Sequence, residues 1–224
     1  MINLLNVAKF YKNLPHQNQA LEKLQTALMS VAPELLSDDA DWVKLWRSTP
    51  QKNNLLPDWQ GGDKWQTVRA ICKECDRQRL HLTQQKAYLL ATVEWETAGT
   101  FAPVREAYWL SEEWRRRNLT RYYPYYGRGY VQLTWSSNYQ QYSELLGLDL
   151  LGNPDLALRP DVALFILVHG CKFGVFTGHK LEDYIISGHC DYWNARRVIN
   201  GTDRATEIEA IARDWERWLK SQVK

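Results

Sequence analysis

Residues 125–135 read YYGRGYVQLTW and gather aromatic rings, a guanidinium, an amide and a hydroxyl within a few positions. The two glycines and the hydroxyl-rich sequence that follows predict a short extended segment that opens into a helix at Ser136. Aromatic rings pack on the apolar face of a sugar ring, whereas amide, hydroxyl and guanidinium groups bind its polar substituents. This segment is therefore typical of a carbohydrate-binding site.

The sequence on both sides of this segment has the apolar spacing of helices. Strand alternation is scarce outside the Gly-Arg-Gly segment, so we predict a mainly α fold with at most a small β-hairpin. Thr83 is predicted to be the N-cap of one helix. The helices predicted in the main part of the chain cover residues 65–80, 83–94, 136–146, 160–173, 180–186 and 203–220.

The first 60 residues are expected to form a separate small helical module. Turn-forming residues at 48–54, 57–58 and 61–62 predict a boundary near residue 60, with the main domain over 61–224. Helical spacing is found at residues 17–30 and 41–47. Two interpretations stay open, a cell-wall-binding module and a helical hairpin packed on the main domain. No catalytic group is identified in this part of the sequence.

Composition restricts the class of partner. The chain has 224 residues, of which 45% are hydrophobic and 24% charged, as is usual for a folded globular protein. A formal net charge of +2 does not favour nucleic acid as a partner. The 11 Trp and 12 Tyr, against 5 Phe, fit either a wet carbohydrate cleft or amphipathic helix packing. The run Arg115–Arg117 suits a solvated helix face or contact with an anionic polymer such as a cell wall.

We predict neither a metal site nor a cofactor. Cys72 and Cys75 form a single CxxC without the second pair that a zinc site requires. No segment reaches the roughly 18 apolar residues of a membrane span, so no stable membrane insertion is expected. Residues 1–8 lack the features of a secretory signal. We therefore expect synthesis in the cytoplasm, with access to the cell wall after release by another factor, and few disulfides.

Three further stretches resemble a known family. Residues 94–101 read EWETAGTF and are followed by Arg105-Glu106, residues 146–157 read LGLDLLGNPDLA, and residues 191–202 read DYWNARRVINGT. Together with YYGRGYVQLTW and Asn138-Tyr139, they resemble the catalytic domain of family 19 glycoside hydrolases, the chitinases and their phage-endolysin relatives. The resemblance covers about residues 83–218 and implies a lysozyme-like helical fold.

Glu96 is the predicted general acid. Glu94 and Glu96 lie about 200° apart around a helix, so they cannot both face one cleft. Glu96 stands where the helix ends, and a carboxyl surrounded by Trp95, Phe101 and the Tyr125-Tyr126 pair would keep its proton through desolvation. In the family, the Glu of a His-Glu-Thr motif is this acid; here Trp95 replaces the His, and Glu96 matches the Glu.

The resemblance implies the remaining roles. Glu106 corresponds to the general base, with Glu112 or Glu113 as alternatives, and Thr134 to the residue that orients the attacking water in an inverting mechanism. Arg128 is also a candidate for orienting either Glu96 or Glu106, and Arg196 or Arg197 for supporting the acid. The predicted substrate-binding residues are Tyr126, Arg128, Gln132, Asn138, Tyr139, Asn200 and Arg197.

We therefore expect a monomeric, peptidoglycan-cleaving endolysin that hydrolyses β-1,4 bonds of an N-acetylated amino-sugar glycan. The short spacing from Glu96 to Glu106, the lack of a signal peptide and the lack of a disulfide framework favour peptidoglycan over chitin. A chitinase is the nearest enzymatic alternative. A non-catalytic glycan-binding relative and a helical structural or effector protein are the alternatives from other classes.

Overall fold

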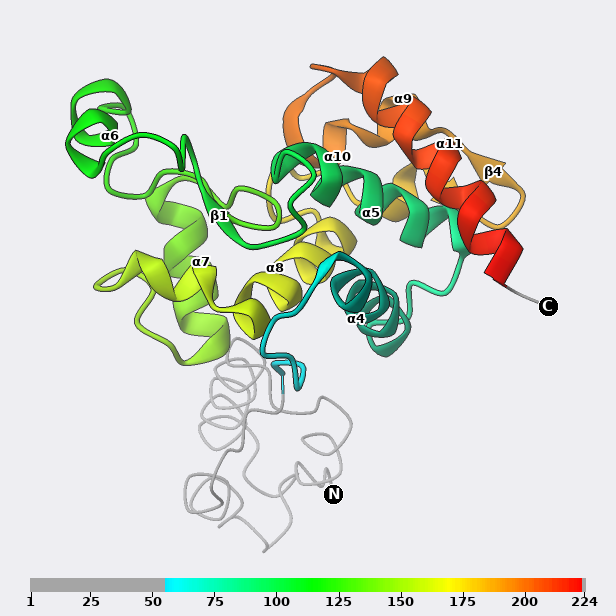
Figure 1. Ribbon diagram of the computed structural model, residues 1–224, viewed down its shortest axis with the longest axis horizontal. Helices are drawn as coiled ribbons and strands as arrows, with labels where there is room; N and C mark the ends of the chain where they lie inside the picture. The colour runs from blue at the N-terminus through cyan, green and yellow to red at the C-terminus, as the bar shows by residue number, and fades with distance from the viewer. Residues whose placement is uncertain (1–54, 223–224) are drawn as a thin grey trace, which may run out of the picture. The chain divides into compact units, whose positions relative to one another are not determined.

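The structure of the protein is a computed structural model, and residues 55–222 are described (Figure 1). The helices predicted over residues 17–30 and 41–47 lie outside the described residues. The division into an N-terminal module and a main domain stays a prediction.

Helices form most of the described chain, which confirms the mainly α prediction. The α-helices are α4 (Lys64–Arg77), α5 (Thr83–Glu96), α6 (Glu112–Asn118), α7 (Ser136–Leu146), α8 (Pro160–Phe173), α9 (Tyr192–Ala195), α10 (Arg197–Asn200) and α11 (Ala205–Gln222). The 3₁₀ helices are η2 (Pro154–Leu158) and η3 (Leu181–Asp183). The strands, each of two residues, are β1 (Val104–Arg105), β2 (Arg128–Gly129), β3 (Ile185–Ile186) and β4 (His189–Cys190).

Helix α8 forms the centre of the core. Its residues 161–168 are all buried, and the helix contacts α4, η2, β2 and η3. The fixed φ of Pro160 suits the first helical position, and Gly174, with φ of 71°, ends the helix in the left-handed conformation. The predicted bounds of this helix are confirmed.

Helix α11 lies along α5 and holds the carboxyl end of that helix in place (Figure 1). Trp215 on α11 stacks edge-to-face on Phe101, with 5.7 Å between ring centres. The same indole donates a hydrogen bond from Nε1 to Oε2 of Glu94, at 2.6 Å. Glu94 thus faces α11. Its hydrogen bond to Trp215 holds the end of α5, two positions before Glu96.

Two antiparallel pairs of strands are present among residues 55–222. The first pairs Val104 with Gly129 and Arg105 with Arg128, which places the loop after β1 beside the glycine-rich segment. The second pairs β3 with β4 around Gly188, whose φ is 81°. The helix predicted over residues 180–186 is therefore wrong. A 3₁₀ turn forms there instead, followed by a strand, because Ile185 and Ile186 are β-branched and a glycine turn follows them closely.

The N-cap prediction at Thr83 is also wrong. Thr83 is the first residue of α5, and the cap is Leu82, whose backbone N–H donates to Oε1 of Gln85 at 3.2 Å. Between residues 55 and 222, no helix has both the length and the apolar character needed to span a bilayer. All four cysteines are free.

Candidate active site

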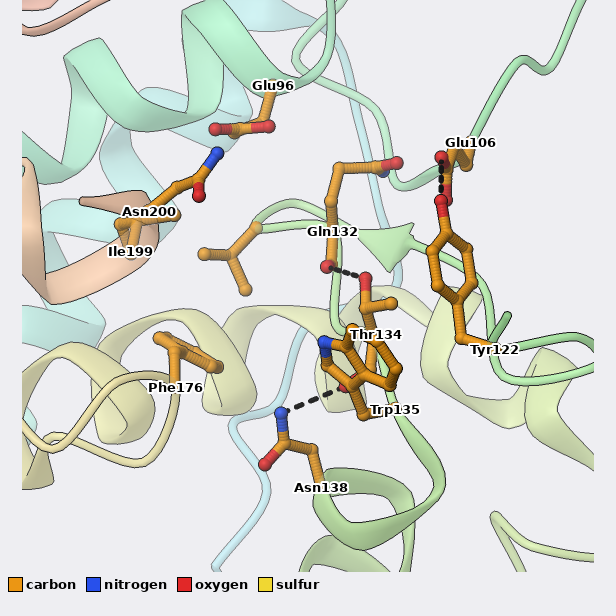
Figure 2. A pocket seen from close by; sticks show the side chains of 11 residues that line it. Glu96, Glu106, Tyr122, Gln132, Thr134, Trp135, Asn138, Phe176, Ile199 and Asn200 are labelled. Carbon is orange, nitrogen blue, oxygen red and sulfur yellow. Dashed lines mark hydrogen bonds between the residues drawn. The ribbon is translucent and has the colours of Figure 1, made fainter. Parts of the chain in front are cut away.

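A cleft of about 330 Å³ collects residues from segments that are far apart in the sequence (Figure 2). Six of the residues proposed from the sequence lie here, namely Glu96, Glu106, Gln132, Thr134, Asn138 and Asn200. Its other lining residues are Tyr122, Val131, Trp135, Phe176 and Ile199. This volume lies in the range of ligand-binding clefts in proteins.

Glu96 is the last residue of α5 and is mostly buried at one side of the cleft. Burial raises the pKa of Glu96, and this effect outweighs the opposing influence of the Arg196 guanidinium. Arg196 donates from Nη1 to Oε1 of Glu96 at 2.8 Å. A carboxyl whose pKa is raised keeps its proton to higher pH, so it is suited to act as a proton donor.

Arg196 is fixed from its other side. The residue is only 2% exposed, and its Nε donates to the backbone carbonyl of Asp203 at 3.0 Å. Of the two arginines that the sequence left open, Arg196 is therefore the one beside the acid. The adjacent Arg197 donates instead to Oδ1 of Asn194, at 3.0 Å, and does not line the cleft. Its predicted substrate contact is not supported by this position.

Glu106 lies across the cleft from Glu96 and receives two hydrogen bonds (Figure 2). Tyr122 donates from its hydroxyl to Oε1 at 2.8 Å, and the backbone N–H of Gly127 donates to Oε2 at 3.0 Å. The backbone N–H of Glu106 also donates to the carbonyl of Gly127, at 2.7 Å, as a continuation of the β1–β2 pairing. One donor to each oxygen is an arrangement that binds a carboxylate and fixes its direction.

Tyr122 is a site residue that the sequence reasoning missed. Burial and the hydrogen bond to Glu106 raise the pKa of Tyr122 to about 12, so its hydroxyl stays protonated and donates. The signal was its position within the tyrosine-rich run just before Pro124. The alternative bases, Glu112 and Glu113, do not line the cleft. Glu112 accepts hydrogen bonds from Tyr126 and Arg115, and Glu113 forms an ion pair with Arg117.

The segment that carries Thr134 has an unusual backbone. Gln132 and Trp135 adopt left-handed φ values of 53° and 76°, a conformation that costs free energy and often occurs at functional sites. Side chains hold it: Gln132 donates from Nε2 to the carbonyl of Val104 at 3.1 Å, and Asn138 donates from Nδ2 to the carbonyl of Thr134 at 2.9 Å. The Thr134 hydroxyl donates to the Gln132 carbonyl at 2.8 Å, which leaves its oxygen to accept from a water.

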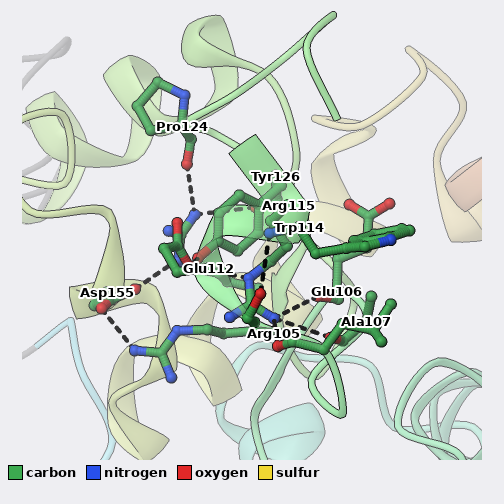
Figure 3. Close-up of polar contacts among 12 residues, drawn as sticks. Arg105, Glu106, Ala107, Glu112, Trp114, Arg115, Pro124, Tyr126 and Asp155 are labelled. Atoms are coloured by element: carbon green, nitrogen blue, oxygen red, sulfur yellow. Dashed lines mark hydrogen bonds and ion pairs between the residues drawn. The ribbon is translucent and has the colours of Figure 1, made fainter. Parts of the chain in front are cut away.

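Three residues predicted to bind substrate are buried and do not line the cleft. Arg128 is 4% exposed and donates from Nε to Oδ1 of Asp155 at 2.8 Å. Asp155 also accepts from Nη2 of Arg105, at 2.7 Å (Figure 3). The Nη1 of Arg128 donates to the carbonyls of Pro124 and Tyr126 and to the hydroxyl of Tyr139, at 2.9, 3.1 and 3.1 Å. Arg128 therefore orients neither Glu96 nor Glu106.

Tyr126 and Tyr139 complete this buried network. The guanidinium carbon of Arg128 lies 3.8 Å from the ring centre of Tyr126, and the Tyr126 hydroxyl donates to Oε2 of Glu112 at 2.8 Å. The Tyr139 hydroxyl also contacts the Tyr126 carbonyl, at 2.9 Å. In this structure the polar groups of these residues bind the protein itself, and none of them lines the cleft, so their substrate-binding role stays a prediction.

In the part of the chain that the structure describes, no group of three or more His, Cys, Asp and Glu side chains is arranged to hold a metal ion. The cleft instead offers two carboxyl groups in different surroundings, with hydroxyl and amide groups between them. Such a pair can supply one proton donor and one proton acceptor to a bound molecule.

Residues 96–167 match the family described as Chitinase class I. This range contains both carboxyl residues of the cleft together with Gln132, Thr134 and Asn138, and excludes Asn200. Chitinase 8 of Oryza sativa subsp. japonica is 60% identical over 42 residues, which are 19% of this chain and 16% of the relative. Inactive chitinase-like protein 1 of Hevea brasiliensis is 56% identical over 41 residues, which are 18% of this chain and 13% of the relative.

Solved structures give a weaker similarity over a longer range. Chitinase C from Streptomyces griseus HUT6037 is 22% identical with a TM-score of 0.48, covering 71% of this chain and 74% of that chain. A bacterial family 19 chitinase is 20% identical with a TM-score of 0.46, covering 74% of this chain and 90% of that chain. The matches to the Oryza and Hevea proteins span less than a fifth of the length of each of these relatives. The similarity to class I chitinases is thus concentrated in the segment that begins at Glu96 and builds most of the cleft.

Proposed function

We propose that the protein is a glycoside hydrolase that cleaves β-1,4 bonds of an N-acetylated amino-sugar glycan. The observation that carries the proposal is the pair Glu96 and Glu106 on opposite sides of one cleft. Burial raises the pKa of Glu96, whereas Glu106 accepts one hydrogen bond at each oxygen. Glycoside hydrolysis by two carboxyl groups requires one protonated and one ionised member.

In the proposed mechanism, Glu96 donates its proton to the glycosidic oxygen as the bond to the anomeric carbon breaks. Glu106 takes a proton from a water that attacks the same carbon from the opposite face. The Thr134 hydroxyl accepts a hydrogen bond from this water and keeps it directed at the carbon. Inversion requires carboxyl groups roughly 6.5–9.5 Å apart, since a water must fit between the base and the sugar.

We further propose peptidoglycan as the natural polymer, cleaved by a monomeric endolysin that is made in the cytoplasm and released to the wall by another factor. Chitin is the second candidate, and the chitinase names of the relatives support it. The two polymers share the β-1,4 linkage and the acetamido group. The cleft residues Gln132, Asn138 and Asn200 suit both, because amide groups pair with acetamido and hydroxyl groups.

The test compares two substrates and three variants. Turbidity loss of purified bacterial walls and cleavage of a soluble chitin oligomer are measured for the wild type, Glu96→Gln, Glu106→Gln and Glu94→Gln. The first two variants are expected to lose at least about 100-fold in kcat, because acid or base assistance is removed while size is kept. Glu94→Gln is the matched control, since Glu94 bonds Trp215 on another face of α5.

Near-normal turnover by Glu96→Gln or Glu106→Gln would remove that residue from the mechanism. NMR of the fresh product tests the stereochemistry, and the α anomer is expected from a β-linked chain. Initial release of the β anomer would make Glu106 a nucleophile instead of a base.

A non-catalytic glycan-binding protein is the alternative from another class. One relative with 56% identity over 41 residues is named inactive, so local similarity alone does not assign turnover. Binding of chitin oligomers by the wild type, with no cleavage of oligomers or walls, would support this alternative. Both carboxyl residues are retained in the cleft, which favours the enzyme.

A further inference from the structure

Arg121 lies beside the cleft, over the ring of Trp135. Its side chain is exposed, and its guanidinium carbon is 5.1 Å from the ring centre of Trp135, which lines the cleft. Arg121 forms no ion pair with any acidic residue in the described range 55–222. Most other arginines near this region are paired, as Arg105 is with Asp155 and Arg117 with Glu113.

The ring under Arg121 is held in a fixed position. Trp135 is 41% exposed although its backbone has a left-handed φ of 76°. Its indole packs edge-to-face on Tyr122 with 5.3 Å between ring centres, and Tyr122 in turn donates to Glu106. The backbone N–H of Trp135 donates to the Tyr125 carbonyl at 2.9 Å. Trp135, which carries the guanidinium of Arg121 on its ring, is thus linked to the proposed base through Tyr122. Figure 2 shows Trp135, Tyr122 and Glu106 on the same side of the cleft.

The charges that line the cleft indicate what the guanidinium of Arg121 could bind. Glu96 and Glu106 are the ionisable acids among the cleft residues, and the same set contains no lysine or arginine. A neutral glycan meets no long-range repulsion there, whereas a glycan that carries carboxylates is repelled by any ionised acid. A cation at the rim offsets that repulsion and pairs with a carboxylate, and a guanidinium is well shaped for this contact.

We infer that Arg121, supported by Trp135, is a recognition site for a carboxylate borne by the bound glycan. The ligand class is an amino-sugar chain with acidic substituents, such as the lactyl-peptide groups of peptidoglycan, and not a neutral chitin chain. This inference rests on the proposed function and specifies its substrate class. Arg121 is a specificity-determining residue in this scheme and takes no part in proton transfer.

The experiment measures binding, so that it does not depend on turnover. Dissociation constants are determined by tryptophan fluorescence or calorimetry for three ligands: a disaccharide–dipeptide fragment of peptidoglycan, the same fragment with its carboxyl groups amidated, and a neutral chitin oligomer. The full chain carrying Glu96→Gln is used throughout to prevent cleavage. Each ligand is tested on this background alone and with Arg121→Gln, Arg121→Lys or Arg116→Gln added.

The background protein is expected to bind the acidic fragment about fivefold more tightly than its amidated form, as for an exposed charge pair. Arg121→Gln should abolish this preference, and Arg121→Lys should retain part of it. Arg116→Gln is the matched control, since it removes the same charge from an exposed position on α6. High salt should reduce the preference in the background protein, because exposed charges are screened.

Two results would overturn the inference. Equal affinity for the acidic and amidated fragments, or a preference that survives Arg121→Gln, would show that Arg121 does not read the carboxylate. If the wild-type protein nevertheless cleaves the chitin oligomer or purified walls, the proposed hydrolase function stands without this specificity. If the protein binds none of the three ligands, both the inference and the proposed function are overturned.

Discussion

Two opposing effects act on the pKa of Glu96, namely its burial and its hydrogen bond with Arg196. Burial favours the neutral acid and raises the pKa of Glu96, while the guanidinium at 2.8 Å favours the carboxylate. The raised pKa shows that burial is the larger effect. Arg196 therefore acts in this scheme as a positioning residue, which holds the carboxyl oxygen without removing its proton.

A pH profile tests this balance. Activity that needs protonated Glu96 falls as the pH rises through the pKa of Glu96. Replacing Arg196 with Met removes the influence that lowers the pKa of Glu96, so the basic limb of kcat/KM should move to higher pH. The profile is measured on a soluble chitin oligomer, or on a soluble wall fragment if that is the better substrate.

The neighbouring arginine provides the control for this profile. Arg197→Met removes a cation one position away that bonds Asn194 and not Glu96, so its basic limb should match the wild type. Arg196→Lys should restore most of the normal profile because it keeps the charge. An unchanged limb in Arg196→Met would show that another group controls the basic side.

At the scale of an element, the glycine-rich segment depends on the buried guanidinium of Arg128. Arg128 bonds Asp155, two backbone carbonyls and the Tyr139 hydroxyl. Burial alone would raise the pKa of Asp155, but hydrogen bonds from Arg105 and Arg128 outweigh it, and the pKa is lowered. Arg128 directly follows Gly127, whose backbone N–H donates to Glu106 in the cleft.

Arg128→Met should therefore lower the free energy of unfolding by about 1–3 kcal/mol, because it leaves buried backbone carbonyls without their donor. Chemical denaturation measures the change. Arg105→Met is the matched control: it removes the other arginine that pairs with Asp155, at an exposed position, and should cost about 1 kcal/mol or less. Normal stability of Arg128→Met combined with a raised KM would instead support its original assignment to substrate binding.

The same segment shows what the sequence can and cannot predict. Apolar spacing located helices α7 and α8, because their buried faces dominate the pattern. The motif also identified Gln132, Thr134 and Asn138 as cleft residues. It did not predict where Arg128 points, since its partner Asp155 lies 27 positions away and is brought near only by folding.

Short elements were missed for a related reason. Helices α6, α9 and α10 and the strand pair β3–β4 are too short to show a periodic apolar face, and tertiary contacts decide their conformation. Tyr122 was missed because its hydrogen bond to Glu106 depends on the β1–β2 pairing that folds the intervening loop back. Sequence pattern thus located the two carboxyl groups of the cleft better than the residues that hold them in position.

At the scale of the whole molecule, the role of the first part of the chain can be tested by removing it. Trp59 donates from Nε1 to the Tyr130 hydroxyl at 3.2 Å, and Arg77 donates to the Leu55 carbonyl at 2.5 Å. Residues 55–60, which the sequence reasoning assigned to the N-terminal module, therefore contact the domain that carries the cleft. A truncated chain should begin at Leu55 instead of Gly61, so that these contacts are kept.

The chain from Leu55 onward is expected to fold and to cleave soluble fragments at a rate close to that of the full chain, because every cleft residue is retained. Thermal unfolding and co-sedimentation with purified walls then separate the two open interpretations of the N-terminal module. A wall-binding module predicts an unchanged Tm and lost co-sedimentation, since only an adhesive surface is removed. A hairpin packed on the main domain predicts a lower Tm, because apolar surface becomes exposed, with little change in sedimentation. A truncated protein that is folded but inert on soluble fragments would contradict the division itself, because the first part of the chain would then be needed for catalysis.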